Sequence, residues 1–354
     1  MKGLVLAAGH GTRLRPLTLT GNKTMLPVAN KPLLFYSIEA LVKAGIKEIF
    51  IVLGRSKDDV RAAIGDGSKF GAKVEYIEQR EAKGLAHAVL ISEPYIGHEP
   101  FVMFLGDNLL REGAKPVVES FMENGTDCAI VVKPVNNPSS YGIAEMEGGK
   151  IKKLLEKPSR PKSNLAVAGL YAFNESVFEA VKNIKPSWRN ELEIVDAVQY
   201  LIDHGKNVKV RFLRDWWKDA GKPDDLLEAN QLVLRDLPAR IEGVIENDSC
   251  VARNVSVGRG TIIRSSMVRG PSVIGNNCSI DSDSYVGPYT SIGDGCKITG
   301  CEIENSIIME NVTIDCKRRI VNSIIGKGSN ITSIANQESQ GFRLVVGDVC
   351  QVVL

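Results

Sequence analysis

The sequence predicts an α/β domain on a mainly parallel sheet, followed by a second domain that is a solenoid of short strands. Two observations lead to this prediction. In the first half, short apolar runs alternate with helical segments, and beyond it apolar residues recur every six positions. At 354 residues the chain is also long for a single domain. We therefore predict two domains, 1–237 and 238–354.

The apolar runs of the first half are typical of strands buried on both faces of a sheet. Short crossover helices between such strands favour parallel pairing, with ligands gathered at the carboxyl ends of the strands. The last element of this half is a predicted helix over 223–237, which begins at Pro223 and is followed by Pro238. The other predicted strands cover 2–9, 48–54, 73–79 and 101–107, and the predicted helices 32–46, 58–67 and 86–96.

The second half has a period of six residues. Glycine often follows the apolar position, at 275, 287 and 293, and a small residue stands four positions on. Each coil of such a repeat buries its apolar edge only by stacking on its neighbours. The hexads resemble those of the left-handed parallel β-helix. The periodic apolar residues are Val251, Val257, Val268, Ile274, Ile280, Val286, Ile292 and Ile298.

Cysteines in this half fit the same period. Cys278 and Cys296 stand 18 residues apart, which is one full coil, so we expect stacked, inward-pointing small residues rather than a metal pair. The seven cysteines form no CxxC pair and predict neither a disulfide framework nor a zinc site. The apolar stretch 342–354 is expected either to cap the last coil or to serve a subunit contact.

Composition excludes several classes of protein. Hydrophobic residues make up 44% and charged residues 24%, as in an ordinary globular protein. A net charge of +2, without a run of five like charges, indicates no nucleic-acid partner and no anionic membrane. The first apolar run, 4–8, is too short for a signal peptide or a membrane helix, so we expect a cytoplasmic protein.

The first predicted strand leads into a loop suited to phosphate. Gly9 and Gly11 can adopt positive φ and let backbone N–H groups converge on a polyanion, while Arg13 and Lys23 add positive charge. The spacing matches neither the GxxxxGK[ST] loop nor the GxGxxG fingerprint, which disfavours kinase-type and dehydrogenase-type sites. An ordinary βα turn is the alternative interpretation.

Two separated acids are candidate ligands of a divalent cation. Asp107 directly follows a buried strand, and Asp219 precedes the start of a helix. Transfer of a phosphoryl or nucleotidyl group usually needs such a cation, held by carboxylates and by the substrate's phosphates. From the residues alone, a turn residue and a loop acid remain alternatives.

The loop motif is long enough to carry a resemblance. G-x-G-T-R-L-x-P, with Lys23 and Leu26-Pro27-Val28 behind it, resembles the signature of the sugar-1-phosphate nucleotidyltransferases. The resemblance implies a Rossmann-like domain, with Asp107 and Asp219 binding Mg²⁺ and with Gln79 and Gly84 facing the nucleobase. The implied nucleotide-binding residues are Leu6, Ala8, Gly9, Gly11, Thr12, Arg13, Lys23, Gln79 and Gly84.

Further matching segments imply a sugar-phosphate site. Arg13, Lys23 and Lys157 are implied to be catalytic, as charges that stabilise pyrophosphate or aim the sugar phosphate. The sequence departs from the family at Asn22 and Thr24, where relatives often carry Pro or Gln. The implied sugar-phosphate residues are Asn108, Gly142, Glu156, Lys157, Val167 and Arg189.

The nearest resemblance is to glucose-1-phosphate thymidylyltransferases of the long type. It implies in-line attack of glucose 1-phosphate on the α-phosphorus of dTTP, with Mg²⁺ and without a covalent enzyme intermediate. Alternatives are a uridylyltransferase that uses UTP with glucose 1-phosphate or N-acetylglucosamine 1-phosphate, and a non-catalytic sugar-nucleotide sensor subunit. The solenoid contains no histidine to act as a base in acyl transfer, so we expect an assembly module that forms a homo-oligomer.

Overall fold

The computed structural model describes residues 1–246 and 248–333, and contacts between Cα atoms divide the chain into two compact units. Unit 1 comprises Met1–Gly11, Thr20–Met25 and Leu33–Asp219. Unit 2 comprises Thr12–Leu19, Leu26–Pro32 and the described residues from Ala220 onward. The domain boundary between 237 and 238 stays a prediction, and the stretch 342–354 lies outside the described residues.

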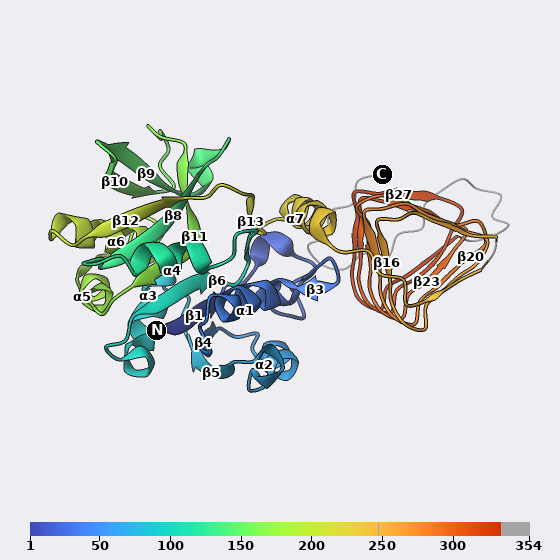
Figure 1. Cartoon of the computed structure of the whole chain (residues 1–354), viewed down its shortest axis with the longest axis horizontal. Coiled ribbons are helices and arrows are strands. Elements are labelled where there is room, and N and C mark those ends of the chain that lie inside the picture. The colour runs from blue at the N-terminus through green and yellow to red at the C-terminus, as the bar shows by residue number, and fades with distance from the viewer. Residues whose placement is uncertain (247, 334–354) are drawn as a thin grey trace. The chain divides into compact units, whose positions relative to one another are not determined.

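Unit 1 is an α/β fold on one large sheet, as predicted. The strand order is β10-β9-β11-β6-β1-β4-β5, with β8 paired to β11 and β12 paired to β8 (Figure 1). Strands β6, β1, β4 and β5 are parallel, whereas β11 pairs antiparallel with β6, β8 and β9, so the other half of the sheet is mixed. The strands are β1 Lys2–Ala7, β4 Glu48–Leu53, β5 Lys73–Glu78, β6 Phe101–Leu105, β8 Cys128–Pro134, β9 Gly142–Glu147, β10 Lys150–Glu156, β11 Leu165–Phe173 and β12 Val208–Phe212.

Helices cover both faces of this sheet. Alternate residues of β1 point to opposite faces, so Leu4 and Leu6 pack with α3, α5 and α6, whereas Val5 and Ala7 pack with α1, α2 and α4. Burial of each such aliphatic side chain contributes roughly 1.5–3 kcal/mol to stability. The helices of unit 1 are α1 Leu33–Lys43, α2 Asp58–Ile64, α3 Leu85–Ile96, α4 Lys115–Phe121, α5 Ser176–Asn183 and α6 Ile194–Asp203, with short 3-10 helices η2 Lys23–Met25, η3 Ser68–Phe70 and η4 Pro138–Ser140.

No helix in the described ranges is both long enough and apolar enough to cross a bilayer.

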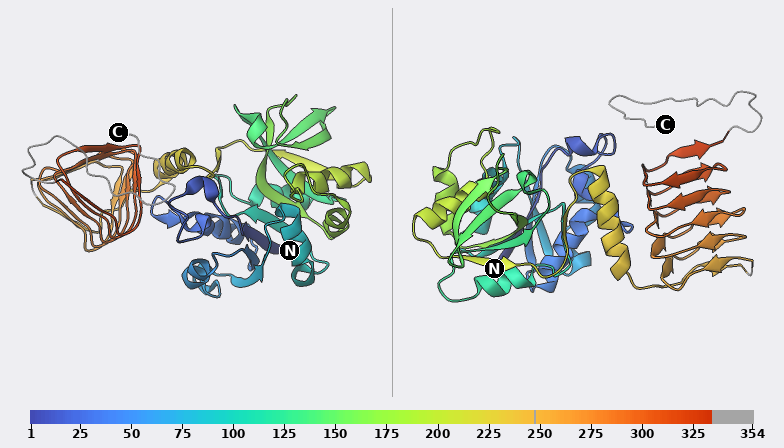
Figure 2. Two further views of the ribbon diagram at one scale, coloured as in Figure 1. Left: turned by 180° about the vertical axis from the view of Figure 1, so that it is seen from behind. Right: turned by 90° about the horizontal axis from the view of Figure 1, so that it is seen from above.

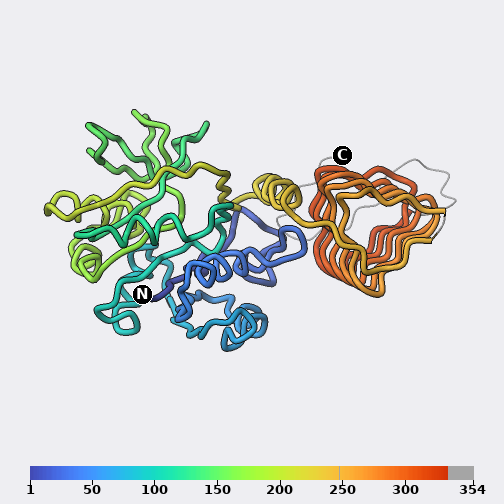
Figure 3. The backbone as a smooth tube through the Cα atoms, in the orientation of Figure 1, coloured from blue at the N-terminus to red at the C-terminus, as the bar shows by residue number. Residues whose placement is uncertain are grey.

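Unit 2 contains a solenoid of three parallel sheets, whose strands stack as rungs (Figure 2, right) and whose coils follow one another around a common axis (Figure 3). The register pairs Ser279 with Lys297 and Lys297 with Thr313, which are steps of 18 and 16 residues. The first sheet contains β14 Val244–Ile245, β17 Ile262–Ile263, β20 Ser279–Asp281, β23 Lys297–Thr299, β26 Thr313–Asp315 and β29 Asn330–Thr332. The second contains β15 Cys250–Val251, β18 Met267–Val268, β21 Tyr285–Val286, β24 Glu302–Glu304 and β27 Arg319–Val321. The third contains β16 Val255–Val257, β19 Ser272–Ile274, β22 Ser291–Ile292, β25 Ile307–Ile308 and β28 Ile324–Ile325.

The six-residue pattern identified the inward positions of this solenoid. The apolar residues from Val268 to Ile298 at that spacing are all buried in one core cluster. Cys278 and Cys296 are buried in the same cluster, which confirms the prediction of stacked small residues.

Helix α7, Pro223–Asp236, begins where the sequence predicts and belongs to unit 2. Its fully buried Asn230 accepts hydrogen bonds from the Ala29 backbone N–H at 2.8 Å and the Ser291 hydroxyl at 2.6 Å, and donates to the Tyr289 carbonyl at 3.0 Å. The Asn30 side chain donates to the Ile292 carbonyl at 2.6 Å. The hairpin of β2 Pro27–Val28 and β3 Lys31–Pro32 is therefore bonded to both α7 and the solenoid.

Candidate active site

The candidate site of unit 1 begins at the carboxyl ends of its parallel strands. In the order β6-β1-β4-β5, these ends are followed by Asp107, Gly9, Gly54 and Gln79. Because neighbouring strands lie about 4.8 Å apart, about 14 Å separates the first end from the last. The topology thus aligns a carboxylate, a glycine loop and an amide along one edge.

The glycine loop leaves β1 after Ala7. Leu6 is buried in the strand, and Ala8 is half-buried. Gly54 lets the loop cross the end of β4, since a Cβ at this position would come within 2.6 Å of the Ala8 carbonyl oxygen. Gly11 has φ +61°, as expected, but the prediction of a positive φ was wrong for Gly9.

Gly9 instead allows the Lys23 side chain to approach. A Cβ on Gly9 would lie 3.1 Å from Lys23 Cε and 3.3 Å from its Nζ. The ammonium group therefore lies against the backbone of the loop. A larger residue at position 9 would have to displace the Lys23 side chain by a few tenths of an ångström, so the glycine serves close approach rather than backbone conformation.

Asn22 and Thr24, the two departures from the family pattern, fix the backbone on either side of Lys23. The Asn22 amide donates to the Ala7 carbonyl at 2.8 Å and the Ser56 carbonyl at 2.9 Å. Its oxygen accepts from the backbone and hydroxyl of Thr24, both at 2.9 Å. Both side chains are buried, so they hold the backbone around Lys23 and do not themselves face the site.

Thr12 and Arg13 lie in unit 2, in the exposed 3-10 helix η1, Thr12–Leu14, which is anchored by the buried Leu14. Their contact with a nucleotide stays a prediction.

The two acids predicted to bind a metal come together. Strand β7, Asn108–Leu110, pairs antiparallel with β13, Trp217–Asp219, and the register places Asp219 directly opposite Asn108. Directly opposite Cα atoms in such a pair are about 4.5–5.5 Å apart. Asp107 immediately precedes Asn108, so two acids 112 positions apart in sequence become neighbours.

Asp107 is buried and paired. Its Oδ2 forms an ion pair with Lys23 Nζ, and its Oδ1 accepts a hydrogen bond from the Asn108 amide at 3.0 Å. Burial alone would raise the pKa of the Asp107 carboxyl, but the Lys23 ammonium and the bonds from Lys23 and Asn108 lower it overall. The carboxylate is therefore ionised at neutral pH.

These acids fit a magnesium ion. Carboxylate oxygens are hard ligands, and each Asp107 oxygen keeps a lone pair beyond the bond it now accepts. Across the described ranges, no three His, Cys, Asp or Glu side chains cluster as a metal site. Two protein carboxylates with further positions left to phosphate and water are what Mg²⁺ prefers.

Asn108 connects the strands that carry the acids. Its Oδ1 accepts from the Trp217 indole N–H at 2.6 Å, while its amide nitrogen bonds Asp107. Gly169 of β11 makes room for it, because a Cβ there would come within 2.7 Å of Oδ1. Trp217 also packs on Tyr141, with ring centroids 5.2 Å apart. The predicted contact of Asn108 with sugar hydroxyls stays a prediction.

Gln79 follows β5, and its side chain is buried. Its amide nitrogen donates to the Gly84 carbonyl at 3.2 Å and lies 3.0 Å from His87 Nδ1. Gly84 precedes α3 with φ +100°, and a Cβ there would come within 2.4 Å of the Leu192 carbonyl oxygen. Leu192 also accepts from the Ala86 backbone at 3.0 Å, so the start of α3 is packed against backbone.

The predicted sugar-phosphate residues form a cluster beside β11. Gly142 pairs with Glu156 across β9 and β10, and Ala166, adjacent to Val167, pairs with Ile143. A Cβ on Gly142 would lie 3.1 Å from the Glu156 carboxylate. The tightest neighbour of such a Cβ would be Val195 Cγ2 at 2.6 Å, so the absence of a side chain makes room first for Val195 and then for that carboxylate.

Two cations contact this carboxylate. Lys157 Nζ lies 3.4 Å and Arg189 Nη1 lies 3.5 Å from Glu156 Oε1, and Arg189 also pairs with Glu193 at 3.3 Å. Burial raises the pKa of Glu156, which Lys157 and Arg189 oppose. Lys157 has φ +42°, an unusual conformation for a residue with a side chain, and such strain concentrates at functional sites.

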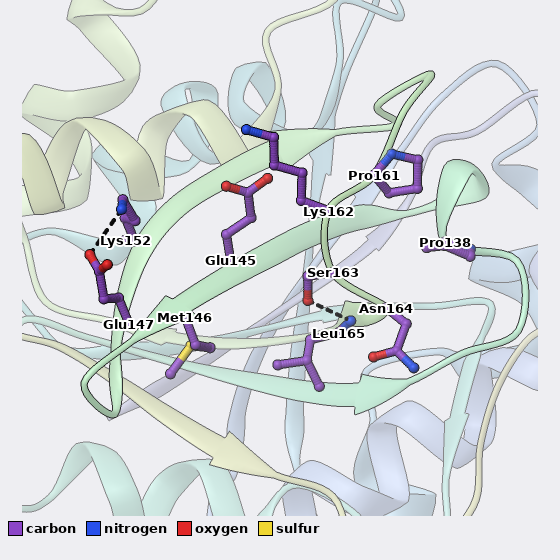
Figure 4. A pocket seen from close by; sticks show the side chains of 10 residues that line it. All are labelled: Pro138, Glu145, Met146, Glu147, Lys152, Pro161, Lys162, Ser163, Asn164 and Leu165. Atoms are coloured by element: carbon purple, nitrogen blue, oxygen red, sulfur yellow. Dashed lines mark hydrogen bonds and ion pairs between the residues drawn. The ribbon is translucent and has the colours of Figure 1, made fainter.

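A cavity of about 820 Å³ lies apart from these residues, along β9, β10 and the segment before β11 (Figure 4). Its Glu147 and Lys152 pair with each other at 3.0 Å. None of the predicted site residues lines it, so we do not assign it to the reaction. The lining residues are Pro138, Glu145, Met146, Glu147, Lys152, Pro161, Lys162, Ser163, Asn164 and Leu165.

Comparison with known proteins agrees with this geometry. The Nucleotidyl transferase family model matches residues 2–236, and the GMPPB C-terminal domain model matches 268–353. This chain belongs to the nucleotidyl transferase family. It is 45% identical over 354 residues to a glucose-1-phosphate thymidylyltransferase of Streptomyces antibioticus, with 99% of each chain covered. It is also 43% identical over 357 residues to the low-salt glycan biosynthesis nucleotidyltransferase Agl11 of Haloferax volcanii, with 100% of each chain covered.

A solved structure extends the comparison to the fold. The UDP-glucose pyrophosphorylase complexed with UDP-glucose is 30% identical, with a TM-score of 0.60 over 67% of this chain and 99% of the other. Nucleotidyltransferases of this kind generally use a divalent metal, a nucleoside triphosphate and a sugar phosphate. The paired acids and the glycine loop of this nucleotidyltransferase are consistent with those requirements.

Proposed function

We propose that this protein makes a nucleoside-diphosphate sugar and pyrophosphate from dTTP and glucose 1-phosphate. The observation that carries the proposal is the pairing of β7 with β13, which makes Asp107 and Asp219 neighbours beside the Lys23 ammonium. The thymidylyltransferase of Streptomyces antibioticus, similar over nearly the whole chain, supports the choice of substrates.

In this reaction a phosphate oxygen of the sugar phosphate attacks the α-phosphorus in line, and the bond from that phosphorus to the pyrophosphate oxygen breaks. No protein nucleophile is required, so the residues act through charge and orientation. Asp107 and Asp219 would hold Mg²⁺, which supplies positive charge to the phosphate oxygens when bound. Arg13 and Lys23 stabilise the negative charge of the departing pyrophosphate.

Lys23 is prepared for this role by its partner. The Lys23 ammonium forms an ion pair with Asp107 and lies against the backbone of Gly9, so a phosphate bound at the glycine loop would lie close to its positive charge. Gly9, Gly11, Thr12 and the backbone of Leu6 and Ala8 complete the proposed nucleotide contacts. Gln79 and Gly84 supply the proposed contacts with the nucleobase.

The sugar phosphate would occupy the second cluster. Lys157 and Arg189 supply positive charge for its phosphate, and Glu156 accepts from sugar hydroxyls together with Asn108. Gly142 and Val167 offer backbone groups of the adjacent strands β9 and β11. The contact of Trp217 with Tyr141 links this cluster to the strand of Asp219.

The test is pyrophosphate release, measured over a panel of nucleoside triphosphates and sugar 1-phosphates with Mg²⁺. We expect the highest kcat/KM with dTTP and glucose 1-phosphate. A clear preference for UTP, with glucose 1-phosphate or N-acetylglucosamine 1-phosphate, would replace this proposal by a uridylyltransferase. Binding of a nucleotide sugar without release from any pair would favour a sensor subunit.

We propose further that residues 1–237 are the catalytic domain and that 238–354 form a left-handed β-helix through which the enzyme makes homo-oligomers. Solenoids of this type usually associate through their flat faces, which supports the assembly role. Light scattering should give a mass of at least twice the 38.5 kDa of one chain. A monomer at micromolar concentration would contradict the assembly role. We expect the enzyme in the cytoplasm, the compartment of nucleoside triphosphates.

A further inference from the structure

The orientation of the Gln79 amide is fixed by two acceptors. Its nitrogen lies 3.2 Å from the Gly84 carbonyl oxygen and 3.0 Å from His87 Nδ1. A carbonyl oxygen can only accept a hydrogen bond, so the nitrogen of the amide, and not its oxygen, must face Gly84. An amide nitrogen has two N–H donors, and these two contacts use both.

His87 can accept the second bond only if its Nδ1 carries no proton. Burial lowers the pKa of the His87 imidazole, and nearby Lys83 lowers it further, while Glu81 opposes them. The neutral ring, with its proton on Nε2, is therefore the form present at neutral pH. It lies on the first turn of α3, three residues after Gly84.

The remaining polar atom of the Gln79 side chain is its oxygen, Oε1. Within the described ranges Oε1 accepts no hydrogen bond, and it is not one of the fully buried side-chain atoms that lack a partner, so it stays accessible to a ligand. A base that covers Oε1 removes it from water, and an acceptor on that base opposite Oε1 would leave both atoms without a hydrogen bond, which is strongly disfavoured. The group opposite Oε1 must therefore present an N–H.

We propose that His87 is a positioning residue that holds Gln79 with only Oε1 available to the nucleobase, so that the site selects a base with a ring N–H at that edge. This inference rests on the proposed function, in which Gln79 faces the base. The imide N3–H of thymine or uracil satisfies the requirement. Cytosine presents an unprotonated ring nitrogen there and is rejected.

The chain offers a matched pair of substitutions. In His87→Asn the side-chain oxygen is as many bonds from Cα as Nδ1, so it can accept the same hydrogen bond. In His87→Leu an apolar carbon of nearly the same size takes that position. Comparison of the two variants separates the acceptor from the volume of the side chain.

The experiment measures kcat and KM for dTTP and dCTP, with glucose 1-phosphate and Mg²⁺, together with the melting temperature. For His87→Leu we expect the KM for dTTP to rise on the order of tenfold. The preference for dTTP over dCTP should shrink by a similar factor, with kcat and the KM for glucose 1-phosphate retained. His87→Asn should restore the preference of the wild type.

The possible outcomes are distinct. Equal losses in both variants, or an unchanged preference in His87→Leu, would overturn the positioning role while transfer by the wild type still supports the proposed function. A wild type that transfers from neither dTTP nor UTP overturns the proposed function and this inference with it. A fall in melting temperature shared by both variants, with base preference lost in neither, would reduce His87 to a packing role and overturn the inference.

Discussion

Replacement of Lys23 by methionine should reduce activity and stability together, because the same ammonium neutralises Asp107 and lies beside the glycine loop. Loss of one charged contact to a transition state costs on the order of 10² to 10³ in rate. The side chains of Lys23 and Asp107 are 19% and 11% exposed, so the substitution leaves a nearly buried carboxylate without its charge partner. Breaking a fully buried pair costs about 3–5 kcal/mol. Asp107 keeps the bond from Asn108, so we expect about 2–3 kcal/mol here.

A double-mutant cycle separates the two effects. Asp107→Asn in the Lys23→Met background removes the unpaired charge, so the free energy of unfolding should recover by about 1–2 kcal/mol. Activity should not recover, because neither the ammonium nor the metal-binding carboxylate returns. Urea unfolding followed by tryptophan fluorescence gives the stability, and pyrophosphate release gives the rate.

A matched surface lysine provides the control. Lys152 pairs with Glu147 at 3.0 Å, but both side chains are more than half exposed. Lys152→Met should change the unfolding free energy by less than about 1 kcal/mol and leave the rate unchanged. If Lys23→Met keeps more than a tenth of the wild-type rate, or is no less stable than Lys152→Met, the reasoning about the Lys23–Asp107 pair is refuted.

Three further substitutions and one treatment test other parts of the molecule. Gly169→Ala should displace the Asn108 side chain, because the new Cβ would come within 2.7 Å of its oxygen. The rate of transfer should fall by at least about tenfold. A fully active variant would show that Asn108 does not position the acids. EDTA should abolish pyrophosphate release, and added Mg²⁺ should restore it. The Asp219→Asn variant should need a higher Mg²⁺ concentration than the wild type for half-maximal activity. An unchanged Mg²⁺ dependence of that variant would show that Asp219 does not bind the metal. Ile280→Ala, in the core of the solenoid, should lower unfolding stability by about 2–5 kcal/mol without changing the rate of transfer at 25 °C, which thermal unfolding and the same assay would check.

The parts of this fold that repeat locally could be predicted from sequence. Apolar runs identified the parallel strands β1, β4, β5 and β6, and the six-residue period identified the inward positions of the solenoid, because both depend on neighbouring residues. The antiparallel strands around β11 could not be predicted in this way. Their pairing depends on partners such as Leu165 and Pro134, 31 positions apart, which no local pattern specifies.

The residues of the candidate site also divide into those that a local pattern indicates and those that depend on partners remote in sequence. Lys23, Asp107 and Asp219 stood out through chemistry and motif. Gly54 and Gly169 did not, because their need for glycine comes from Ala8 and Asn108, which are remote in sequence. His87 does not stand out from the sequence, since only the folded chain shows its ring beside Gln79. Spacing from Gly84 was the one available signal, as it places His87 on the first turn of a helix.

The network around Asn230 has a practical consequence for dissecting the protein. A shortened chain that stops at 237 would delete Tyr289, Ser291 and Ile292. Asn230 would then keep only the hydrogen bond from Ala29, and the hairpin would lose the bond from Asn30 to Ile292. That hairpin immediately follows the segment of Lys23. Crystallographers and enzymologists who want a minimal version should therefore retain the coils up to at least Ile292, even though the family model for transfer ends at residue 236.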